Sequence, residues 1–501
     1  MNVLTGGRPV PVAGGERETR TLSGDSPNLR REPVFTERRR SVPALLGATA
    51  IGVYVLVVAG ATAAIAEAAR ACPTWPTCQG PVLSDPALAV AWGHRITAAA
   101  VGALVVVTAV AAFRRRESTR RRVLAALALA LALFPVQVAL GAVVVVDGPT
   151  APTTGAHLVV GMVIFSALAV ALAWDLEPAD ADDEGIGLQF DRGESSDEPT
   201  DGPAVSELPP ATRAKATLFA YFRLTKPRLM WLLCLVAAAG MALASTTGPD
   251  LTVRTVVLTL GGGVLSIGAS GTFNHVLERD RDKRMSRTND RPVATHQLPA
   301  RNAVAFGLVL AVASLLVFAG VNLLAAALGL SAIVFYSVVY TLVLKPNTVQ
   351  NTVIGGFAGA LPALIGWVAV TGSIGLPAVA LAGLIFLWTP AHFYNLALAY
   401  KEDYARGGFP MLPVVRGEAT TRKHILLYLA ATLSAAVVLA AVTTLGWVYA
   451  ATTSCFGAVF LWAVVRLHRE RDEAAAFRAF HASNAYLGAV LLAIVVDALA
   501  L

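Results

Sequence analysis

The stretch NHVLERDRDKRMSRTNDRP, from Asn274 to Pro292, determines how the rest of the chain is read. It follows an apolar run, 253–273, that is long enough to cross a bilayer, and it turns abruptly polar. Because Asn274, Glu278 and Asp282 are spaced four residues apart, they share one face of a continuing helix. Such an all-oxygen face suits Mg²⁺, which usually shares its coordination shell with substrate phosphates.

Basic residues surround this face and follow it, and phosphate oxygens prefer such partners. They are Arg279, Arg281, Lys283, Arg284, Arg287 and Arg291. The same charges are typical of a solvated cytoplasmic loop, and charges alone favour that interpretation. Asp280 lies about 200° around the helix from Glu278, which predicts a solvated side chain rather than a ligand.

The composition indicates an all-α polytopic membrane protein. The chain has 501 residues, of which 55% are hydrophobic and 15% are charged, and its mean hydropathy is +0.62. Soluble domains carry about 25% charged residues. The net charge of +7 does not indicate a nucleic-acid partner, because basic residues of membrane proteins collect in cytoplasmic loops.

The apolar segments predict thirteen spans in two groups, four and then nine, in a cell membrane. An acidic, Gly-, Pro- and Ser-containing stretch separates the groups and is typical of an extended linker. The predicted regions are a disordered basic cytoplasmic tail at 1–40, a four-span domain at 41–175, the acidic linker at 176–215 and a nine-span domain at 216–501. The predicted spans are 44–66, 89–112, 123–146, 156–174, 228–246, 254–277, 301–319, 322–343, 352–371, 376–398, 425–445, 447–465 and 483–500.

The basic connections predict the orientation. With the N-terminus in the cytoplasm, 114–122, 278–301, 400–423 and the segment after 465 all fall on the cytoplasmic side. The opposite connections hold few basic residues, so thirteen spans satisfy the positive-inside rule and place the C-terminus outside.

A second polar cluster, YKEDYARGGFPMLPV (400–414), falls on the same side as the opening stretch. Two acidic clusters at one membrane face could bind one diphosphate through metal ions. Metal-assisted departure of diphosphate leaves an allylic cation, which needs an apolar, water-poor cavity. A helical bundle supplies such a cavity, and its aromatic walls can stabilise a cation.

The second domain resembles the intramembrane prenyltransferase superfamily and, within it, the protoheme IX farnesyltransferase (heme O synthase) family. The resemblance covers about 217–500 and rests on five blocks in the family's order. They are LTKPR (224–228), the opening stretch, YTLVLKPNTVQNTVIGGFAGALPALIGWVAVTG (340–372), LWTPAHFYNLAL (387–398) and DYARGGFPMLPV (403–414). The superfamily's first motif is N-x3-D-x3-D, and here Glu278 replaces the first Asp while remaining an oxygen ligand.

This resemblance implies that the nine-helix domain transfers the farnesyl group of farnesyl diphosphate to a vinyl group of heme b, with Mg²⁺ as cofactor. Water completes the addition and gives heme O. The implied metal and catalytic residues are Asn274, Glu278, Asp282 and Asp403. The implied contacts for diphosphate or for heme propionates are Lys226, Arg228, Arg287, Lys345 and Lys401.

Two histidines of this domain are candidates for contact with heme. His392 lies inside a predicted span beside Pro390, where a heme-facing role and a packing role are equally supported. His275 adjoins the metal face, which favours a contact with heme or another substrate. Trp388, Tyr340 and Tyr394 are predicted as cavity wall.

The first domain has two pairs of residues on the predicted outer side. Cys72 and Cys78 could form a disulfide there, because the exterior is oxidising. His94 and His157 each begin a span that runs inward, so they are expected at the same depth. Two such histidines in a four-helix bundle could ligate one heme iron, although two interfacial histidines explain the pattern as well.

The segments CPTWPTC (72–78), HR (94–95), QVALGAVVV (137–145) and HLVVG (157–161) resemble one half of the heme A synthase family. That family oxidises heme O to heme A, the step after farnesyl transfer. Ala91 stands where the family commonly has Glu, and the second half is missing. The resemblance therefore favours heme b binding in this four-helix domain over heme A synthase activity.

Two other functions remain open. One is a prenyltransferase for a quinone or lipid acceptor, and the other is a non-catalytic protein that delivers heme for oxidase assembly. The expected partners are heme b and farnesyl diphosphate as substrates and the lipid bilayer, with heme–copper oxidase assembly factors or a second copy of the chain as further candidates.

Overall fold

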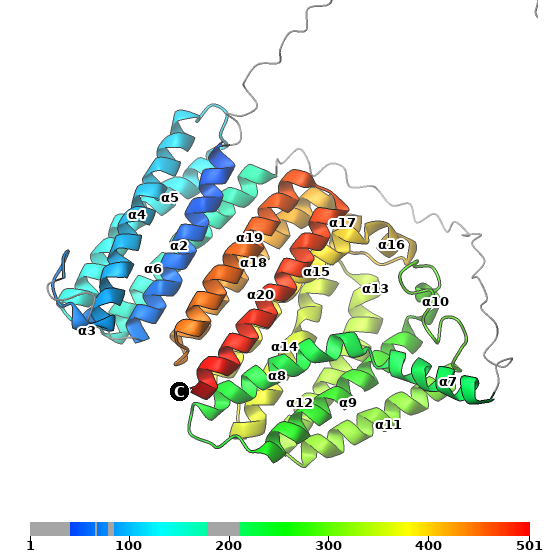
Figure 1. The fold of residues 1–501 in the computed structure, drawn as a ribbon. Helices are drawn as coiled ribbons and strands as arrows, with labels where there is room; N and C mark the ends of the chain where they lie inside the picture. Colours follow the sequence, from blue (N-terminus) through cyan, green and yellow to red (C-terminus); the bar gives the residue numbers. More distant parts are fainter. Residues whose placement is uncertain (1–40, 66–67, 79–84, 178–209, 501) are drawn as a thin grey trace, which may run out of the picture. The chain divides into compact units, whose positions relative to one another are not determined.

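The computed structural model describes residues 41–65, 68–78, 85–177 and 210–500, and these form helices joined by turns, without a strand among them (Figure 1). Thirteen of the described helices are long and apolar enough to cross a membrane, which confirms the predicted all-α polytopic fold. The predicted tail, 1–40, and most of the predicted linker lie outside the described residues.

The first four spans form the N-terminal bundle, and neighbouring helices in the chain pack on each other (Figure 1). Its helices are α2 (Ser41–Ile65), α3 (Ala68–Ala71), α4 (Pro86–Arg114), α5 (Arg121–Val146) and α6 (Ala151–Leu176). A disulfide joins Cys72 to Cys78 after α3. Arg95 closes this loop by donating hydrogen bonds to the carbonyls of Cys72 (3.2 Å), Thr74 (2.9 Å) and Pro76 (3.1 Å).

The remaining nine spans form the second bundle, in which α9 packs on α11, α8 on α14, α15 on α18 and α19 on α20. A short helix, α7 (Pro210–Leu224), precedes it. The other elements are α8 (Pro227–Ser245), α9 (Val253–Leu277), α10 (Arg279–Asp282), α11 (Ala300–Ala319), α12 (Leu323–Val334), η3 (Phe335–Leu344), α13 (Lys345–Asn347), α14 (Asn351–Thr371), α15 (Leu376–Ala399), α16 (Lys401–Arg406), α17 (Leu412–Val415), α18 (Gly417–Ala441), α19 (Trp447–Glu470) and α20 (Glu473–Ala500).

Several helices extend beyond their predicted spans. Helix α18 begins at Gly417 rather than 425, α19 continues to Glu470, and α20 begins at Glu473 rather than 483. The added turns carry charged residues, which a hydropathy pattern excludes although they continue the helix into the interface.

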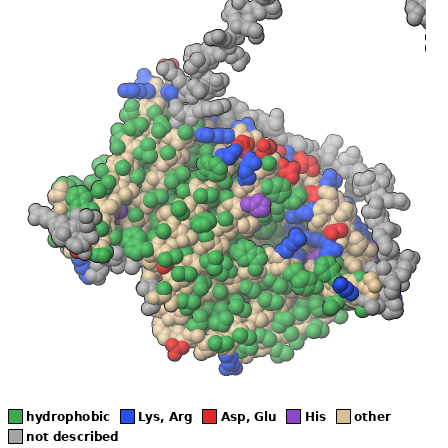
Figure 2. Space-filling model, viewed as in Figure 1, with side chains coloured by type: hydrophobic (Ala, Val, Ile, Leu, Met, Phe, Trp, Pro, Cys, Tyr) green, Lys and Arg blue, Asp and Glu red, His purple; other side chains and the backbone are tan. Residues whose placement is uncertain are grey.

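Charged side chains and apolar side chains occupy different parts of the surface. Figure 2 shows hydrophobic side chains along the flanks of the helices, while most charged side chains in view gather toward one end. On α11 the exposed apolar residues include Leu308, Val309, Val312 and Leu316, each more than half exposed. In a membrane these flanks face lipid rather than water.

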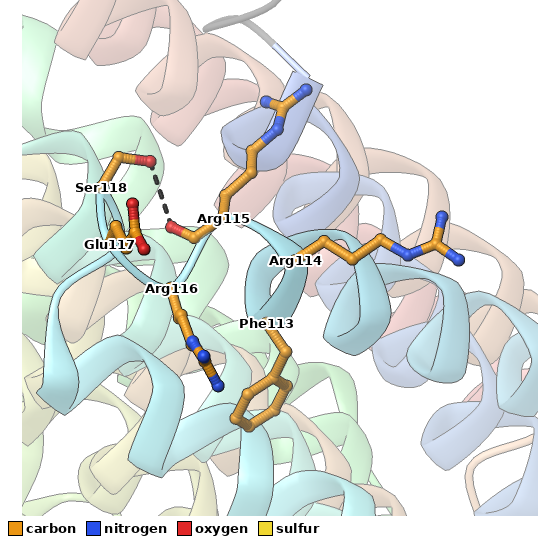
Figure 3. Close-up of a pocket in the computed structure, with 6 residues that line it drawn as sticks. All are labelled: Phe113, Arg114, Arg115, Arg116, Glu117 and Ser118. Carbon is orange, nitrogen blue, oxygen red and sulfur yellow. Dashed lines mark hydrogen bonds between the residues drawn. The ribbon is translucent and has the colours of Figure 1, made fainter.

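The arginine-rich turn between α4 and α5 is part of this charged end. Figure 3 shows Arg114, Arg115 and Arg116 pointing in different directions, and the Ser118 hydroxyl donates to the carbonyl of Arg115 at 3.1 Å. Because the three guanidinium groups diverge, they cannot enclose one anion. Their position agrees instead with a basic connection at a membrane surface.

Polar contacts also join the bundles. Tyr54 of α2 is fully buried, and its hydroxyl lies 3.0 Å from the hydroxyl of Thr453 on α19. At the charged end, the Glu177 carboxylate accepts a hydrogen bond from Arg422 of α18 at 2.5 Å. Glu177 directly follows α6, so the described chain is ordered into the region predicted as linker.

Glycines allow α8 and α14 to approach closely, as small residues do between membrane helices. A Cβ atom on Gly366 would lie 2.0 Å from the carbonyl oxygen of Ala237, and one on Gly240 would lie 2.5 Å from that of Ala363. Neither carbonyl can move without displacing its helix.

We expect Gly366→Ala to separate α8 from α14 and to cost about 1–3 kcal/mol through overpacking. Thermal unfolding of the purified chain in detergent should show a lower midpoint. Gly383→Ala on α15 is the matched control, because a Cβ there meets no atom within 4 Å. Equal midpoints for the two variants would contradict the close-packing account.

Candidate functional site

A cavity of about 690 Å³ lies within the second bundle and is lined from α8, α9, η3, α14, α15 and α20. Most of its wall is apolar or aromatic, with Trp231, Phe318, Tyr340 and Trp388 among the lining residues. Charged side chains concentrate at the end where α8 begins and α9 ends. The site therefore combines an apolar chamber with a charged entrance.

The charged end carries more positive than negative side chains. Among the described lining residues, five are cationic, namely Lys226, Arg228, Arg287, Arg291 and Lys345, while Glu278 is the single carboxylate. If all are charged, the lining has a net charge of +4. Such an excess in a partly enclosed site favours an anion with several negative charges.

Five polar residues that line this end are called the polar collar: Lys226, Asn274, Glu278, Arg291 and Lys345. The Lys345 ammonium donates to Glu278 at 2.6 Å, and the Arg291 guanidinium lies 3.8 Å from the same carboxylate. Burial alone would raise the pKa of Glu278, but Lys345, Lys226 and Arg291 hold that pKa below its usual value. Glu278 is therefore an ionised oxygen donor.

Lys226 reaches the collar from an unusual backbone conformation. It precedes Pro227 at the start of α8 with φ 54°, in the left-handed region. Gly271 of α9 makes room for this turn, because a Cβ there would lie 2.9 Å from the carbonyl oxygen of Leu224. The ammonium donates to Asn274 and lies 3.4 Å from the Tyr336 hydroxyl. Burial, with Arg291 nearby, lowers the pKa of Lys226 to about 7.

The helix bends where the sequence predicted continuity. Helix α9 ends at Leu277, and α10 begins at Arg279, although the amide of Asp282 still donates to the carbonyl of Glu278 at 2.8 Å. Asn274 and Glu278 line the cavity, whereas Asp282 does not. Its two carboxylate oxygens each accept from Arg291 at 2.8 Å. Asp280 is 74% exposed, as predicted.

A π-helical segment, η3, brings two further groups to the cavity. Nine positions separate Tyr336 from Lys345, which would place them about 180° apart on an α-helix. The wider turns of η3 let both line the cavity. The Thr341 hydroxyl donates to the carbonyl of Tyr336 at 2.8 Å and accepts from Asn274 at 3.3 Å. Insertions of π-helix often occur at functional sites.

Asp403 braces the loop after α10 and does not line the cavity. It accepts from the backbone amides of Ser286 and Arg287, both at 3.0 Å, from the Ser286 hydroxyl at 2.5 Å and from Arg406. Burial opposes ionisation of Asp403, but these hydrogen bonds lower its pKa below the usual value. The Asp403 carboxylate therefore holds the backbone at Arg287.

Two tyrosines hold Arg287 at the cavity. Its guanidinium donates to the Tyr404 hydroxyl at 3.2 Å and lies 4.9 Å from the ring centroid of Tyr400 and 5.3 Å from that of Tyr404. Lys401 takes no part in this contact. It lies outside the lining and pairs with Glu418 at 2.9 Å.

The two candidate histidines of this bundle have different positions. His392 lines the cavity, stacks between Trp388 and Phe480, and has its Nδ1 atom 2.7 Å from the Ser483 hydroxyl. That hydrogen bond and the two stacked rings fix the orientation of the imidazole. His275 is buried outside the lining, and its Nδ1 atom has no hydrogen-bond partner among the described residues.

The cavity thus gathers seven of the predicted site residues: Lys226, Arg228, Asn274, Glu278, Arg287, Lys345 and His392. Asp282, Asp403, Lys401 and His275 are not among its lining residues. No group of three or more His, Cys, Asp or Glu side chains suited to a metal occurs in the described part of the chain.

Sequence reasoning missed several lining residues. Tyr336, Thr352, Tyr404 and Asn484 carried no signal that separated them from ordinary span or loop residues. Arg291 was grouped with the other arginines, although it is the one that contacts both Glu278 and Asp282. Only the fold shows which arginine turns inward.

In the N-terminal bundle, His94 and His157 each lie against a glycine of the neighbouring helix. A Cβ on Gly60 would be 3.1 Å from the His94 ring, and one on Gly141 would be 3.1 Å from the His157 ring. Both Nδ1 atoms are buried without a hydrogen-bond partner among the described residues. Gln137 lies 3.4 Å from His157 Nε2. Such rings have the unused donor or acceptor capacity that a ligand would satisfy.

Comparison with known proteins identifies both regions. A model of the UbiA prenyltransferase family matches residues 232–488, and a model described as cytochrome oxidase assembly protein matches residues 85–190. Protoheme IX farnesyltransferase of Haloarcula marismortui is 65% identical over 467 residues, which are 92% of this chain and 99% of that protein. Protoheme IX farnesyltransferase 1 of Saccharopolyspora erythraea is 46% identical over 292 residues, 58% of this chain and 92% of that protein.

Among solved structures, a UbiA homologue from Archaeoglobus fulgidus, described as bound to DMAPP and Mg²⁺, matches 55% of this chain and 98% of its own. Its sequence identity is 18% and its TM-score is 0.41. The predicted family resemblance is confirmed by the family model and by the relatives of high identity. The chain therefore belongs to the protoheme IX farnesyltransferases of the UbiA prenyltransferase family, and a region matching the cytochrome oxidase assembly protein family precedes its prenyltransferase region.

Proposed function

We propose that this chain transfers the farnesyl group of farnesyl diphosphate to a vinyl group of heme b, in a Mg²⁺-dependent reaction that yields heme O. The observation that carries the proposal is the cavity, which is apolar along its wall and cationic at one end. A prenyl chain fits the apolar part, and its diphosphate fits the polar collar. High identity to protoheme IX farnesyltransferases supports heme b as acceptor.

The diphosphate would bind to the cations of the collar together with Arg287 and Arg228. Arg291 and Arg287 offer planar, fork-shaped donors, which match phosphate oxygens. Lys226 and Lys345 add point charges beside Asn274 and Glu278. These residues would fix the head of the substrate, so that its first carbon points into the apolar chamber.

The donor set at the collar fits Mg²⁺ when a diphosphate completes the shell. Asn274 and Glu278 line the cavity and offer oxygen atoms, and Mg²⁺ commonly takes one or two protein carboxylates plus phosphate oxygens. Asp282 and Asp403 remain predicted ligands, although Arg291 and the 286–287 amides now occupy their oxygens. A bound Mg²⁺ would supply neutralisation of the charge on the leaving diphosphate.

The chain's own residues would then control the reaction. The bond between the first prenyl carbon and the diphosphate oxygen breaks, and its electron pair leaves with the diphosphate. The faces of Tyr336 and Tyr340 stabilise the allylic cation, and the apolar wall keeps water away from it. The vinyl group donates its electron pair to that carbon, and water adds to the resulting cation with loss of a proton.

His392 is the candidate contact for the porphyrin, because it lines the cavity with its ring held between Trp388 and Phe480. His275 remains a predicted heme contact outside the lining. Lys401 remains a predicted diphosphate contact, with its present partner Glu418.

The first test is incubation of membranes containing the full chain with heme b, farnesyl diphosphate and Mg²⁺. We expect heme O by pigment analysis, and its loss when the divalent ion is chelated. Prenylation of a quinone or lipid in place of heme would establish the alternative acceptor. Tight heme b binding without prenylation would establish a heme-delivery protein.

Within that assay, we expect Glu278→Gln to lower turnover about 100-fold or more, since metal-assisted charge stabilisation contributes several kcal/mol. Asp280→Asn is the control, because Asp280 lies in the same segment but is 74% exposed. Its turnover should stay within about twofold of the wild type, as for most surface changes. Full turnover by Glu278→Gln would remove Glu278 from the proposed site.

We further propose that the N-terminal bundle holds one heme b between His94 and His157. The glycines beside both rings and the unpartnered Nδ1 atoms support this role. Ala91 is buried in an apolar cluster with Cys72, Cys78 and Leu88. That position offers no carboxylate, which favours heme binding over oxidation of heme O to heme A.

Heme b titrated into the full chain should give the absorption spectrum of a low-spin iron with two histidine ligands. His94→Ala and His157→Ala should each abolish that component, because one ligand is lost. His296→Asn is the matched control, since Asn tolerates the positive φ of 59° at that position. A low-spin spectrum that survives both alanine variants would exclude this pair.

The remaining proposals concern location and partners. We infer a cytoplasmic N-terminus and an external C-terminus in a cell membrane from the basic connections. Three of them, represented by Arg120, Arg422 and Arg471, meet at Glu177. Heme–copper oxidase assembly factors or a second copy of the chain remain predicted partners of the N-terminal bundle.

A further inference from the structure

We propose that Glu177, where the N-terminal bundle ends, is a positioning residue for Arg287 of the second bundle. It acts through three linked side chains, Arg422, Glu418 and Lys401. The inference rests on the proposed function, because it takes Arg287 as a contact for the prenyl diphosphate. It gives the N-terminal bundle a role in prenyl transfer that is separate from heme binding.

The first link is a buried ion pair between the bundles. The Glu177 side chain is fully buried, and the Arg422 side chain is 6% exposed. The carboxylate accepts from Arg422 at 2.5 Å and lies 3.6 Å from Arg471. Its main-chain carbonyl accepts from Arg120 at 3.4 Å. Glu177 is thus fixed from both bundles.

The second link runs along α18 to α16. Arg422 lies 3.5 Å from Glu418, one helical turn earlier, and Glu418 accepts from Lys401 at 2.9 Å. Lys401 is the first residue of α16. The alternating charges therefore connect the end of α6 to the start of α16 without a break.

The third link runs from α16 to the cavity. Asp403 of α16 accepts from the backbone amide of Arg287 at 3.0 Å, and Tyr404 accepts from its guanidinium at 3.2 Å. Both Tyr404 and Arg287 line the cavity. A shift of α16 would therefore move the guanidinium relative to the polar collar.

The same ion pair also docks the two bundles, so docking has to be separated from positioning. Burying an ion pair is often no more stabilising than apolar packing of the same volume, but a pair fixes the relative placement of its partners. The bundles also meet at Tyr54 and Thr453, which lie outside the charged chain that leads to α16. Substitution of Tyr54 therefore serves as a control: it weakens the contact between the bundles and leaves the chain of charged side chains from Glu177 to Lys401, here called the relay, intact.

The test measures two quantities on the full chain, the KM for farnesyl diphosphate in heme O formation and the affinity for inorganic diphosphate by calorimetry. We expect Glu177→Gln to raise KM and to weaken diphosphate binding about fivefold or more, the range usual for coupled sites, with kcat within about twofold. Tyr54→Phe should change neither quantity. Glu177→Asp, which keeps the charge at shorter reach, should give an intermediate effect.

A double-mutant cycle with Glu418→Gln tests the route. If both residues act through one chain, the double variant should resemble the single variants rather than multiply their effects. Multiplied effects would overturn the relay, and so would an unchanged diphosphate affinity in Glu177→Gln. Equal losses of diphosphate affinity in Glu177→Gln and Tyr54→Phe would show that Glu177 acts only by holding the bundles together. If the wild-type protein binds diphosphate but makes no heme O, heme b is not its acceptor. The diphosphate affinities of the variants still test the relay in that case.

Discussion

Excess positive charge around one buried carboxylate is the constraint on which the site depends. Glu278 is held by Lys345 and Arg291, and further cations surround it at the end of an apolar cavity. Uncompensated charge is costly inside a membrane protein, so such an arrangement persists where a ligand of opposite sign completes it. The break between α9 and α10, the turn at Lys226 and the π-helix all serve to bring these groups together.

Much of the fold could be predicted from the sequence, because each span has to satisfy its own backbone in lipid and therefore appears as a long apolar run. The paired acidic clusters also indicated the end of the second bundle at which charged residues line the cavity. The sequence could not predict which charged side chains pair with each other. Four-residue spacing grouped Asp282 with Glu278, but Arg291 returns nine positions later and binds Asp282.

The π-helix explains why the sequence pattern did not place Tyr336 and Lys345 on one side. Periodicity analysis assumes 3.6 residues per turn, and on that assumption Tyr336 and Lys345 face opposite sides. The structure brings both to the cavity, because the π-helix η3 has more residues per turn than an α-helix. The bracing role of Asp403 was hidden for a related reason, since its partners are backbone amides at 286–287, which no side-chain pattern reveals.

The contact between the bundles is partly polar, with Thr453 beside the hydroxyls of Tyr54 and Tyr486 and an ion pair at Glu177. One apolar core cluster also includes residues of both bundles. Two separate proteins with such an interface would have to overcome the loss of translational and rotational freedom on association. Within one polypeptide that loss is largely removed, and the effective concentration of one bundle around the other is set by the connecting chain. Joining the two therefore secures a one-to-one ratio of the N-terminal bundle and the prenyltransferase bundle at any expression level.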